Sequence, residues 1–275
     1  MSETLRFTLG QCEIIKIPEV EIPLPTQKLY PDQQGEGHLP DTIQLSVHSW
    51  VVRTPQQTLI IDTSNGNGRD RPRSPFFHQL HTRWLEHLMA AGVNPDQVDL
   101  VLMTHLHGDH IGWNTHRVDG VWQPLFKNAR YICSATGLAA WEQDPARQTL
   151  MEDSLRPVIA AGLLDTIDLT QQNTFADCLT YLPTPGHTQD HASVILYSDG
   201  DWGIFSGDLM HSTLQVSQPE LASCFCENAE QAEQQRRRMM AWAADHQALW
   251  FSSHFAESSA GYISRQNGHY RWQYA

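Results

Sequence analysis

The sequence has few basic side chains. Its 275 residues include 18 Lys and Arg against 31 Asp and Glu, which gives a formal net charge of −13. Proteins that bind the phosphate backbone of a nucleic acid rely on basic surface, so this balance argues against a nucleic-acid partner. Part of the excess acid is accounted for if carboxylates here hold metal ions.

Long apolar runs are also missing. No stretch approaches the ~20 consecutive apolar residues that a membrane-spanning helix needs. Met1 to Gln11 lacks the basic and then apolar layout of a secretory signal. We therefore expect a cytoplasmic protein without a membrane partner. The hydrophobic share of 40% and the charged share of 18% indicate a folded, globular chain.

Cysteine is scarce as well. The five cysteines are odd in number and widely spaced, so reduced thiols are expected rather than a disulfide framework. They are Cys12, Cys133, Cys178, Cys224 and Cys226. The last two are separated by one residue, but no second pair completes a metal site. We expect them as small side chains on one face of an extended segment.

The first 42 residues are rich in Pro and Gly. A first strand is expected near Cys12–Ile17, and the rest of this segment is expected as an extended arm or loop. Residues 1–275 are expected to form one α/β domain, with the arm 1–42 at its start. A homodimer is compatible with such an arm.

Downstream of the arm, strands in pairs alternate with helices. Apolar, β-branched runs predict a hairpin from Ser46–Val52 and Thr58–Ile61. Apolar spacing predicts a helix over Pro75–Ala91, and good helix formers predict another over Asn228–His246. The run Arg236–Arg238 within the second helix is expected on a solvated face rather than in an anion site.

The most informative stretch is Thr104–His110, which reads THLHGDH. It places three imidazoles and one carboxylate within six residues, directly after the largely apolar run Val98–Met103, which predicts a buried strand. A neutral imidazole suits a borderline metal such as zinc, and a carboxylate adds a harder, anionic ligand. A loop at the carboxyl end of a strand is where α/β enzymes place their chemistry.

Three later segments also offer ligand-type side chains at expected strand ends. They are Gly186-His187, Gly207-Asp208 and His254. Alone, a loop histidine is more often a surface or hydrogen-bonded residue than a metal ligand. Together with the cluster at 105–110, they predict one metal site that is assembled from separate parts of the chain.

Taken in order, these motifs resemble the metallo-β-lactamase superfamily. The residues that carry the resemblance span about 45–255 and are Asp62 after a strand, His105-x-His107-x-Asp109-His110, Gly186-His187, Gly207-Asp208 and His254. The resemblance implies a four-layer αβ/βα sandwich with a dinuclear metal site at one edge. It implies two Zn²⁺, with Fe, Mn or Co as alternatives.

The resemblance also assigns the ligands. The first metal is expected on His105, His107 and His187, the second on Asp109, His110 and His254, and the bridge is expected to be Asp208. Asp62 is expected to orient a ligand imidazole by a hydrogen bond. Its other reading, a turn-forming Asp before a Gly-rich loop, is compatible with that role.

Two such ions, ~3.5–4 Å apart, are expected to turn a bridging water into hydroxide, which attacks a carbonyl or phosphoryl centre. Catalytic roles are expected for Asp208, Asp109 and His211. Related lactonases often have a tyrosine where His211 stands. His211 is therefore either a donor to the developing oxyanion or a structural histidine.

A bridging aspartate argues against β-lactam hydrolysis as the main activity. Asp109-His110 with Asp208 is similar to methyl-parathion-hydrolase-like enzymes and acyl-homoserine-lactone lactonases. We expect a small-molecule substrate, an ester of lactone or aryl type, with phosphotriester cleavage as a side activity. A glyoxalase-type thioesterase and a β-lactamase-like amide hydrolase are the alternatives, followed by an iron-dependent redox enzyme or a nuclease.

An apolar pocket for the substrate is expected beside the metal site. Trp113 follows the metal loop directly, and Phe225 stands near the later motifs, so both are expected to line the pocket. Trp50 is expected in ordinary core.

Overall fold

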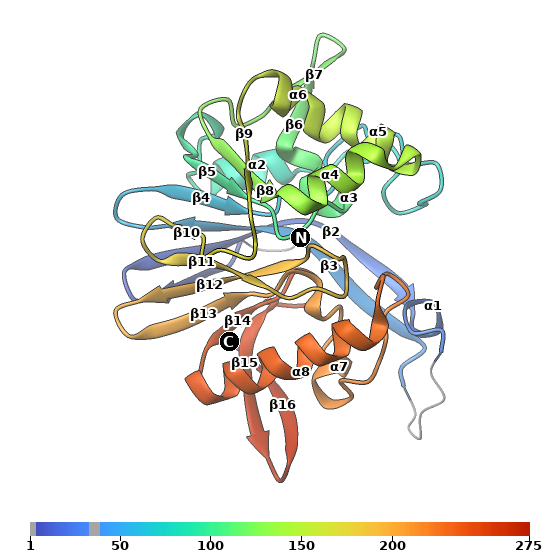
Figure 1. Cartoon of the computed structure of the whole chain (residues 1–275), viewed down its shortest axis with the longest axis vertical. Helices are drawn as coiled ribbons and strands as arrows, with labels where there is room; N and C mark the ends of the chain where they lie inside the picture. Colours follow the sequence, from blue (N-terminus) through green and yellow to red (C-terminus); the bar gives the residue numbers. More distant parts are fainter. Residues whose placement is uncertain (1–3, 33–38) are drawn as a thin grey trace.

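Two mixed β-sheets lie face to face with helices on their outer sides (Figure 1). The computed structural model describes residues 4–32 and 39–275. The order of layers is helices, sheet, sheet and helices, so the expected four-layer αβ/βα sandwich is confirmed. Whether the chain is a single domain stays a prediction.

The first sheet has seven strands in the order β1-β2-β3-β4-β5-β8-β9. Its strands are β1 (Arg6–Leu9), β2 (Cys12–Pro25), β3 (Thr42–Arg53), β4 (Thr58–Ile61), β5 (Leu100–Leu102), β8 (Arg130–Ser134) and β9 (Leu164–Ile167). β1 to β4 pair antiparallel, and β4, β5, β8 and β9 pair parallel. The carboxyl ends of β4 and β5 therefore meet at one edge.

The second sheet has seven strands in sequence order. They are β10 (Thr174–Phe175), β11 (Leu179–Pro183), β12 (Ala192–Ser198), β13 (Asp201–Phe205), β14 (Leu249–Phe251), β15 (Ala260–Gln266) and β16 (His269–Tyr274). β13 and β14 pair parallel, so the loops after them start side by side. A separate hairpin, β6 (Thr115–Val118) with β7 (Val121–Pro124), projects from the molecule (Figure 1).

Helices cover the outer face of each sheet. The first sheet is covered by helices from residues 84–160, and the second by α7 (Leu214–Ser217) and α8 (Ala229–His246). The elements on the first sheet are α2 (Trp84–Ala90), α3 (Gly108–Ile111), α4 (Ala135–Gln143), α5 (Gln148–Leu150), the π turn Met151–Leu155 and α6 (Arg156–Ala160). Short 3₁₀ turns span Pro95–Gln97, Gly112–Asn114, Pro145–Arg147 and Gly207–Leu209. α1 (Thr26–Leu29) follows β2.

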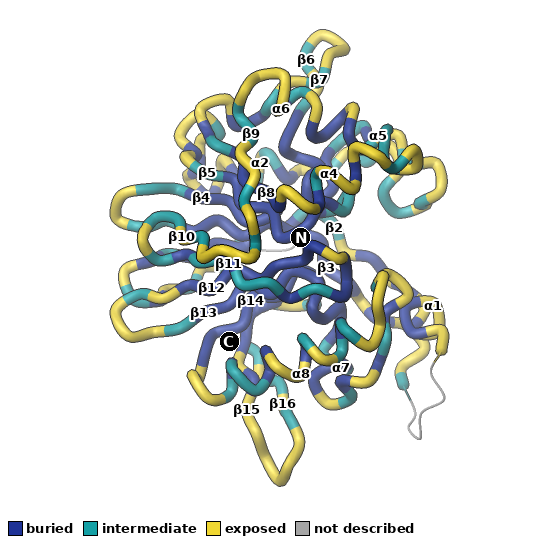
Figure 2. The backbone as a smooth tube through the Cα atoms, viewed as in Figure 1, coloured by how far each residue is buried: buried dark blue, intermediate teal, exposed yellow. Residues whose placement is uncertain are grey.

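The interior is divided into apolar clusters that hold these layers together. Buried residues lie where the two sheets face each other, and exposed ones lie on outer loops and hairpin tips (Figure 2). Between the sheets, Trp50 packs on Phe251 at 5.0 Å between ring centroids, and Phe251 stacks on Phe205. Trp50 is thus a core residue, as expected.

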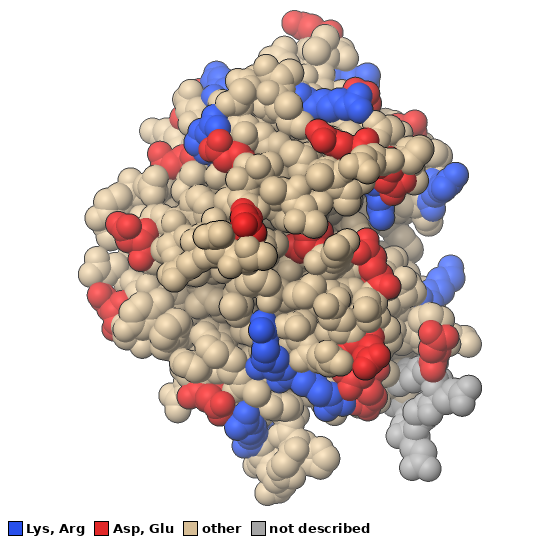
Figure 3. Space-filling view, in the orientation of Figure 1, with Lys and Arg blue, Asp and Glu red and all other residues tan. Residues whose placement is uncertain are grey.

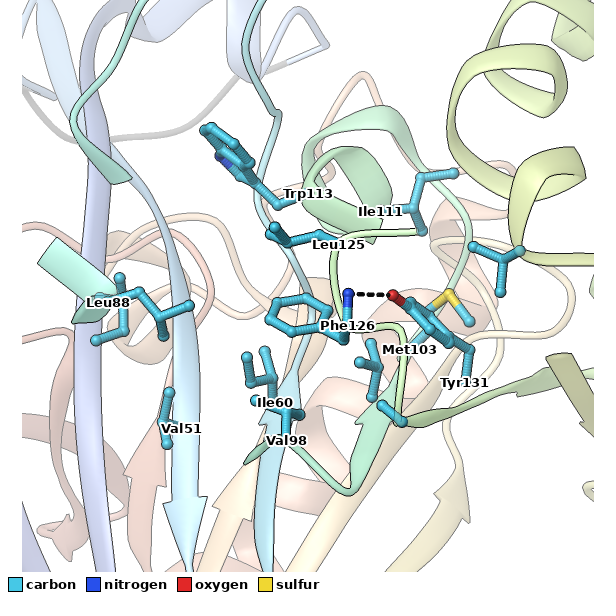
Figure 4. Packing of buried hydrophobic residues seen from close by; sticks show 14 of the residues in the cluster. Val51, Ile60, Leu88, Val98, Met103, Ile111, Trp113, Leu125, Phe126 and Tyr131 are labelled. Carbon is cyan, nitrogen blue, oxygen red and sulfur yellow. Dashed lines mark hydrogen bonds between the residues drawn. The ribbon is translucent and has the colours of Figure 1, made fainter. Parts of the chain in front are cut away.

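A second cluster lies between the first sheet and its helices (Figure 4). Trp84 of α2 stacks on Trp113 with centroids 5.0 Å apart. The hydroxyl of Tyr131 accepts a hydrogen bond from the backbone N–H of Phe126 and donates one to the carbonyl of Asn114, both at 3.0 Å. The stretch that follows the metal loop is therefore fastened to the core.

The amino-terminal segment is not the arm expected from the sequence. β2 continues to Pro25 and pairs with β3 from Glu13↔Arg53 to Pro25↔Thr42, with a bulge between Pro18 and Val20. β1 pairs with only its first four residues, so most of β2 is an edge strand. An edge strand tolerates prolines because one row of its N–H groups needs no partner. Residues 1–3 and 33–38 of the expected arm lie outside the described residues.

The helix expected over Pro75–Ala91 is shorter. It begins at Trp84, after turns in which Gln79 has a positive φ of 52°. The apolar spacing reflects two environments, because Phe76 and Phe77 pack beside β2 and β3 rather than on the helix. The expected helix from Asn228 is confirmed, and the Asn228 side chain caps it by accepting from the N–H of Gln231 at 3.0 Å.

Two further expectations need correction. Arg236 is buried rather than solvated, because its guanidinium donates to backbone carbonyls of the loop that follows β13, including Leu209 at 2.9 Å. Cys224 and Cys226 lie in a turn rather than in an extended segment. All five cysteines are free in the structure, and the expectation of reduced thiols stays a prediction. Among the described residues, no helix has the length and apolar character to cross a bilayer.

Trp84 offers a test of the core. Replacement by Ala is expected to lower the free energy of unfolding by about 3–5 kcal/mol, because a fully buried indole leaves a cavity next to Trp113. Met89→Ala on the exposed side of the same helix is the matched control, with a change within about 0.5 kcal/mol. Urea denaturation measures both, and equal effects would contradict the packing described here.

Candidate metal centre

The loop after β5 carries the histidine cluster, and the loop after β4 supports it. Asp62 directly follows β4 and accepts hydrogen bonds from the backbone N–H and the hydroxyl of Thr104, both at 2.8 Å. Its Oδ2 also lies 2.8 Å from Nδ1 of His110. Asp62 thus lies where an acid that orients an imidazole of the cluster was predicted.

Gly112 allows these two loops to approach each other. Its N–H donates to the carbonyl of Ser64 at 2.7 Å. A Cβ added at Gly112 would lie 1.8 Å from the carbonyl oxygen of Asn65, a distance at which any side chain collides with backbone. Glycine directly after α3 is therefore required by the close contact of the β4 and β5 loops.

Two groups of ligand-type side chains converge at this edge of the sandwich. The first is His105, His107, His187 and Asp208, and the second is Asp109, His110 and His254. In each group, the candidate ligand atoms lie within 4.8 Å of one another. All seven ligands expected from the sequence are therefore brought together, and their binding of metal stays a prediction.

Asp208 faces both groups, with one oxygen toward each. Its Oδ2 lies 3.1 Å from Nε2 of His187 and 3.8 Å from Nε2 of His105. Its Oδ1 lies 3.2 Å from Nε2 of His110 and 3.0 Å from Nε2 of His254. A carboxylate placed in this way has the geometry to contact two cations at once.

Several ligand atoms of these residues have no hydrogen-bond partner among the described residues, and this suits them to bind divalent cations. Nε2 of His105, Nε2 of His110 and Oδ1 of Asp208 are buried and lack a hydrogen-bond partner among the described residues. Nε2 of His187 and Nδ1 of His107 lie 2.9 Å apart and point at the same space. Buried polar atoms without partners are costly, and cation binding would satisfy them.

The other ring nitrogen of several candidate ligands is held from outside. Nδ1 of His254 lies 3.1 Å from the carbonyl of Ser46, and Nδ1 of His105 lies 3.0 Å from the hydroxyl of Thr104. Nδ1 of His187 lies 3.8 Å from the thiol of Cys226. Contacts of this kind fix the orientation of a metal-binding imidazole.

Burial and charge divide the imidazoles into two kinds. Burial lowers the pKa of His105 and His187, and lowers the pKa of His107 to about 4, so these three are neutral and ready to coordinate. Burial also opposes charge on His110 and His254, but nearby carboxylates, Asp208 above all, outweigh it and raise both pKa values. Without metal, protonated imidazoles therefore balance the carboxylates.

His211 lies against the same centre. Its Nε2 is 3.4 Å from Oδ2 of Asp208, and its ring stacks on that of His254 with 5.4 Å between centroids. Both of its ring nitrogens lack a hydrogen-bond partner among the described residues, although the side chain is buried. Burial lowers its pKa, so the ring is neutral and offers one N–H. Its backbone is fixed by an N–H bond to the Gln215 side chain at 2.7 Å.

A cavity of about 450 Å³ opens onto the candidate ligands. Its wall is mostly apolar and comes from β2, β3 and the loop before α2, together with Phe225. The lining residues are Ile22, Leu24, Leu45, Val47, Ser74, Phe76, Phe77, His107, Gly108, Asp109, Arg147, His187, Asp208, His211, Phe225 and His254. Phe225 thus lies where the sequence predicts a pocket residue.

Trp113 does not line this cavity. Its side chain lies in the core, where it is 5% exposed, stacks on Trp84 and donates to Oε1 of Glu19 at 2.6 Å. Proximity to the metal loop along the chain suggested a pocket position. Trp113 instead belongs to the 3₁₀ turn Gly112–Asn114, whose three residues are all buried.

Glu19 is a supporting residue that the sequence did not reveal. Beside the bulge in β2, its carboxylate accepts hydrogen bonds from the backbone N–H groups of Asn65 and Gly66, from Trp113 and from Thr82, at 2.6–3.2 Å. It therefore joins the edge strand to the loop that presents Asp62. An acid within an apolar strand, IPEVEIP, was the available signal.

The fold and this ligand arrangement define a class of protein, and comparison with known families agrees. A model described as "Metallo-beta-lactamase superfamily" matches residues 42–240, which is well over half of the chain. The chain belongs to the metallo-beta-lactamase superfamily, as the motifs predicted.

The individual proteins that this chain resembles have low sequence identity to it. An atrochrysone carboxyl ACP thioesterase of Aspergillus fumigatus is 27% identical over 189 residues, which is 67% of this chain and 47% of that protein. The match thus spans about half of the thioesterase. The crystal structure of hydrolase AbOPH superposes with a TM-score of 0.83 at 21% identity, covering 100% of this chain and 98% of that one.

A lactonase has the same fold. AidC, a dizinc quorum-quenching lactonase in complex with the product N-hexanoyl-L-homoserine, superposes with a TM-score of 0.80 at 19% identity. The alignment covers 100% of this chain and 98% of AidC. At this identity the likeness shows the fold. The named relatives are hydrolases, which agrees with the class of enzyme that the sequence predicts.

The role of Glu19 can be measured through stability. Glu19→Gln exchanges one acceptor oxygen for an NH₂ group that faces the N–H donors, and is expected to lower the free energy of unfolding by about 1–3 kcal/mol. Glu86→Gln is the control, because Glu86 is exposed and pairs only with Arg83 on the surface. Urea denaturation measures the free energy of unfolding of both variants. An equal loss in the two variants would exclude the supporting role of Glu19.

Proposed function

We propose that this chain is a metal-dependent hydrolase with two divalent cations, most simply Zn²⁺, that opens lactones or cleaves aryl esters. The single observation that carries the proposal is the position of Asp208, whose two oxygens face two groups of imidazoles at the end of an apolar cavity. Such a cavity suits an acyl or aryl group, and polar side chains at one end suit its scissile bond.

The ligands proposed for the cations are those expected from the sequence. His105, His107 and His187 would hold the first, Asp109, His110 and His254 the second, and Asp208 both. Cations bound there supply an acidified water and a Lewis acid for the carbonyl oxygen. Zinc suits this mixture of imidazole and carboxylate, whereas Fe, Mn and Co share the same ligand preferences and stay alternatives.

The protein's own residues perform the remaining tasks. The apolar wall from β2 and β3 holds the acyl part and excludes water from the reacting bond. His211 is neutral and lies beside Asp208, so its N–H can donate to the oxygen that becomes negative during attack. The carboxylates of Asp208 and Asp109 are the groups that can accept a proton as the intermediate collapses.

A thioesterase is the second candidate. The observation in its favour is the match to the fungal ACP thioesterase, which has the highest sequence identity to this chain among the three proteins named above. The chemistry at the acyl carbon is the same, and the leaving group is a thiol instead of an alcohol. The glyoxalase-type alternative belongs to this candidate, and phosphotriester cleavage stays a proposed side activity.

The remaining alternatives have less support. On the face shown in Figure 3, basic and acidic side chains are interspersed, and the chain as a whole carries −13, which does not favour a nuclease. A β-lactamase-like amide hydrolase is disfavoured by the bridging aspartate. An iron-dependent redox enzyme is distinguished by metal analysis of protein purified without added metal. A homodimer stays a prediction.

A substrate panel tests the proposal. Metal-replete protein is expected to hydrolyse lactones and aryl esters with higher kcat/KM than a thioester, a phosphotriester or a cephalosporin. Asp208→Ala is expected to lose at least about 10³-fold in kcat, because it removes the group shared by both cation positions. Failure on every lactone and ester, together with turnover of the thioester, would replace this proposal with the thioesterase.

Metal binding is measured independently of activity. Adding Zn²⁺ to chelator-treated protein is expected to raise Tm, with two equivalents bound, because the cations bind the folded state. Affinity is expected to weaken as pH falls, since His110 and His254, whose pKa values are raised above the ordinary value of an imidazole, must lose their protons before they can bind the cation. His105→Ala should reduce the rise in Tm and bind fewer than two equivalents, because one of the two ligand sets loses a member, whereas the exposed His269→Ala should keep the full rise. An unchanged rise with two equivalents bound in His105→Ala would contradict the assignment.

A further inference from the structure

One charged side chain in the cavity has no part in the proposed chemistry. Arg147 is the only Lys or Arg among the residues that line the cavity within the described chain. It stands in the 3₁₀ turn Pro145–Arg147, between α4 and α5, whereas the apolar lining comes largely from β2 and β3. In Figure 1, α4 and α5 lie above β2 and β3.

The Arg147 guanidinium is held in place by an aromatic ring. Its Cζ lies 4.9 Å from the ring centroid of Trp141 of α4, which is itself buried. The same indole lies 6.3 Å, centroid to centroid, from the candidate ligand His107. A cation stacked on a buried indole keeps a defined direction, so the charge has a fixed position relative to the ligands.

The hydrogen-bonding capacity of Arg147 is largely unused. Its side chain has one acidic neighbour, Asp144, with 3.5 Å between Nε and Oδ2. Within residues 4–32 and 39–275, no group accepts a hydrogen bond from either Nη atom. By contrast, Arg71 nearby is engaged by Asp153 through both Nη atoms, at 2.7 and 2.9 Å. Arg147 therefore presents two free donor groups to a cavity whose wall is apolar along β2 and β3 and whose polar side chains are mainly the candidate ligands and His211.

We propose that Arg147 selects substrates that carry a carboxylate at the end remote from the scissile ester. The planar guanidinium matches a carboxylate with two parallel N–H bonds, and it gains most where the surroundings are apolar. The inference rests on the proposed esterase function and specifies its substrate class. The substrate would place its ester at Asp208 and its carboxylate at Arg147, with the carbon chain along Ile22, Leu24 and Val47.

Matched ester series test this selection. The 4-nitrophenyl half-esters of adipate, pimelate and suberate carry the carboxylate, and the 4-nitrophenyl esters of hexanoate, heptanoate and octanoate have the same chain lengths without it. Wild-type protein is expected to show a lower KM for the charged member of each pair, with an optimum at one length because the guanidinium is fixed.

Arg147→Gln is expected to raise KM for the charged esters by about tenfold, with kcat and the KM of neutral esters changed less than about twofold. Arg147→Lys should retain part of the preference, because the charge remains and the paired donors do not. Arg156→Gln on α6 is the control, since Arg156 pairs with Glu152 outside the cavity, and it should leave the preference unchanged.

Other results would overturn the inference. An unchanged charged-to-neutral ratio in Arg147→Gln excludes selection. An equal loss on both series, accompanied by lower Tm and lower metal content, assigns Arg147 a structural role instead. If the wild type cleaves no ester, the proposed function is wrong. The selection of carboxylates by Arg147 is then tested by ligand binding instead of by activity. Monomethyl adipate, which keeps one carboxylate, should then bind about tenfold more tightly than neutral methyl hexanoate by calorimetry, and only in chains that keep Arg147; equal binding of the two overturns the inference.

Discussion

The structure depends on stabilising the negative charge of the Asp208 carboxylate, which is buried away from water. Burial raises the pKa of such a group, yet the pKa of Asp208 lies well below its ordinary value because the imidazoles of His110 and His254 lie against it. A buried carboxylate is stable only with positive charge at close range. The imidazoles supply that charge as protons, and divalent cations would supply more of it. Four separate loops must therefore converge on one point.

The two sheets provide that convergence. Strand ends of the first sheet deliver the cluster after β5, and strand ends of the second deliver His187, Asp208 and His254 after β11, β13 and β14. Further contacts then fix the directions of the side chains. Ser46 of β3 in the first sheet holds His254 of the second, and within the first sheet Glu19 of β2 holds the loop that presents Asp62. The edge strand β2 thus supports the centre without contributing a ligand.

The sequence revealed the ligands better than their surroundings. His105 to His110 and Asp208 were recognisable because each follows an apolar strand, and strand ends meet at one edge whatever the intervening chain does. Ile22 and Leu24 were missed because prolines suggested a loop, and only the pairing of β1 shows that β2 is an edge strand. Trp113 and Arg236 were misplaced because side-chain direction depends on tertiary contacts that periodicity does not encode.

The lining of the cavity and the candidate ligands belong to different stretches of the chain. Ile22 and Leu24 precede residue 42, where the match to the superfamily begins, whereas the ligands up to Asp208 lie inside that match. Most of β2 is held by β3 alone, so its outward-facing edge carries few constraints from neighbouring strands. A substitution at Ile22 or Leu24 therefore changes the shape of the cavity without replacing any candidate ligand.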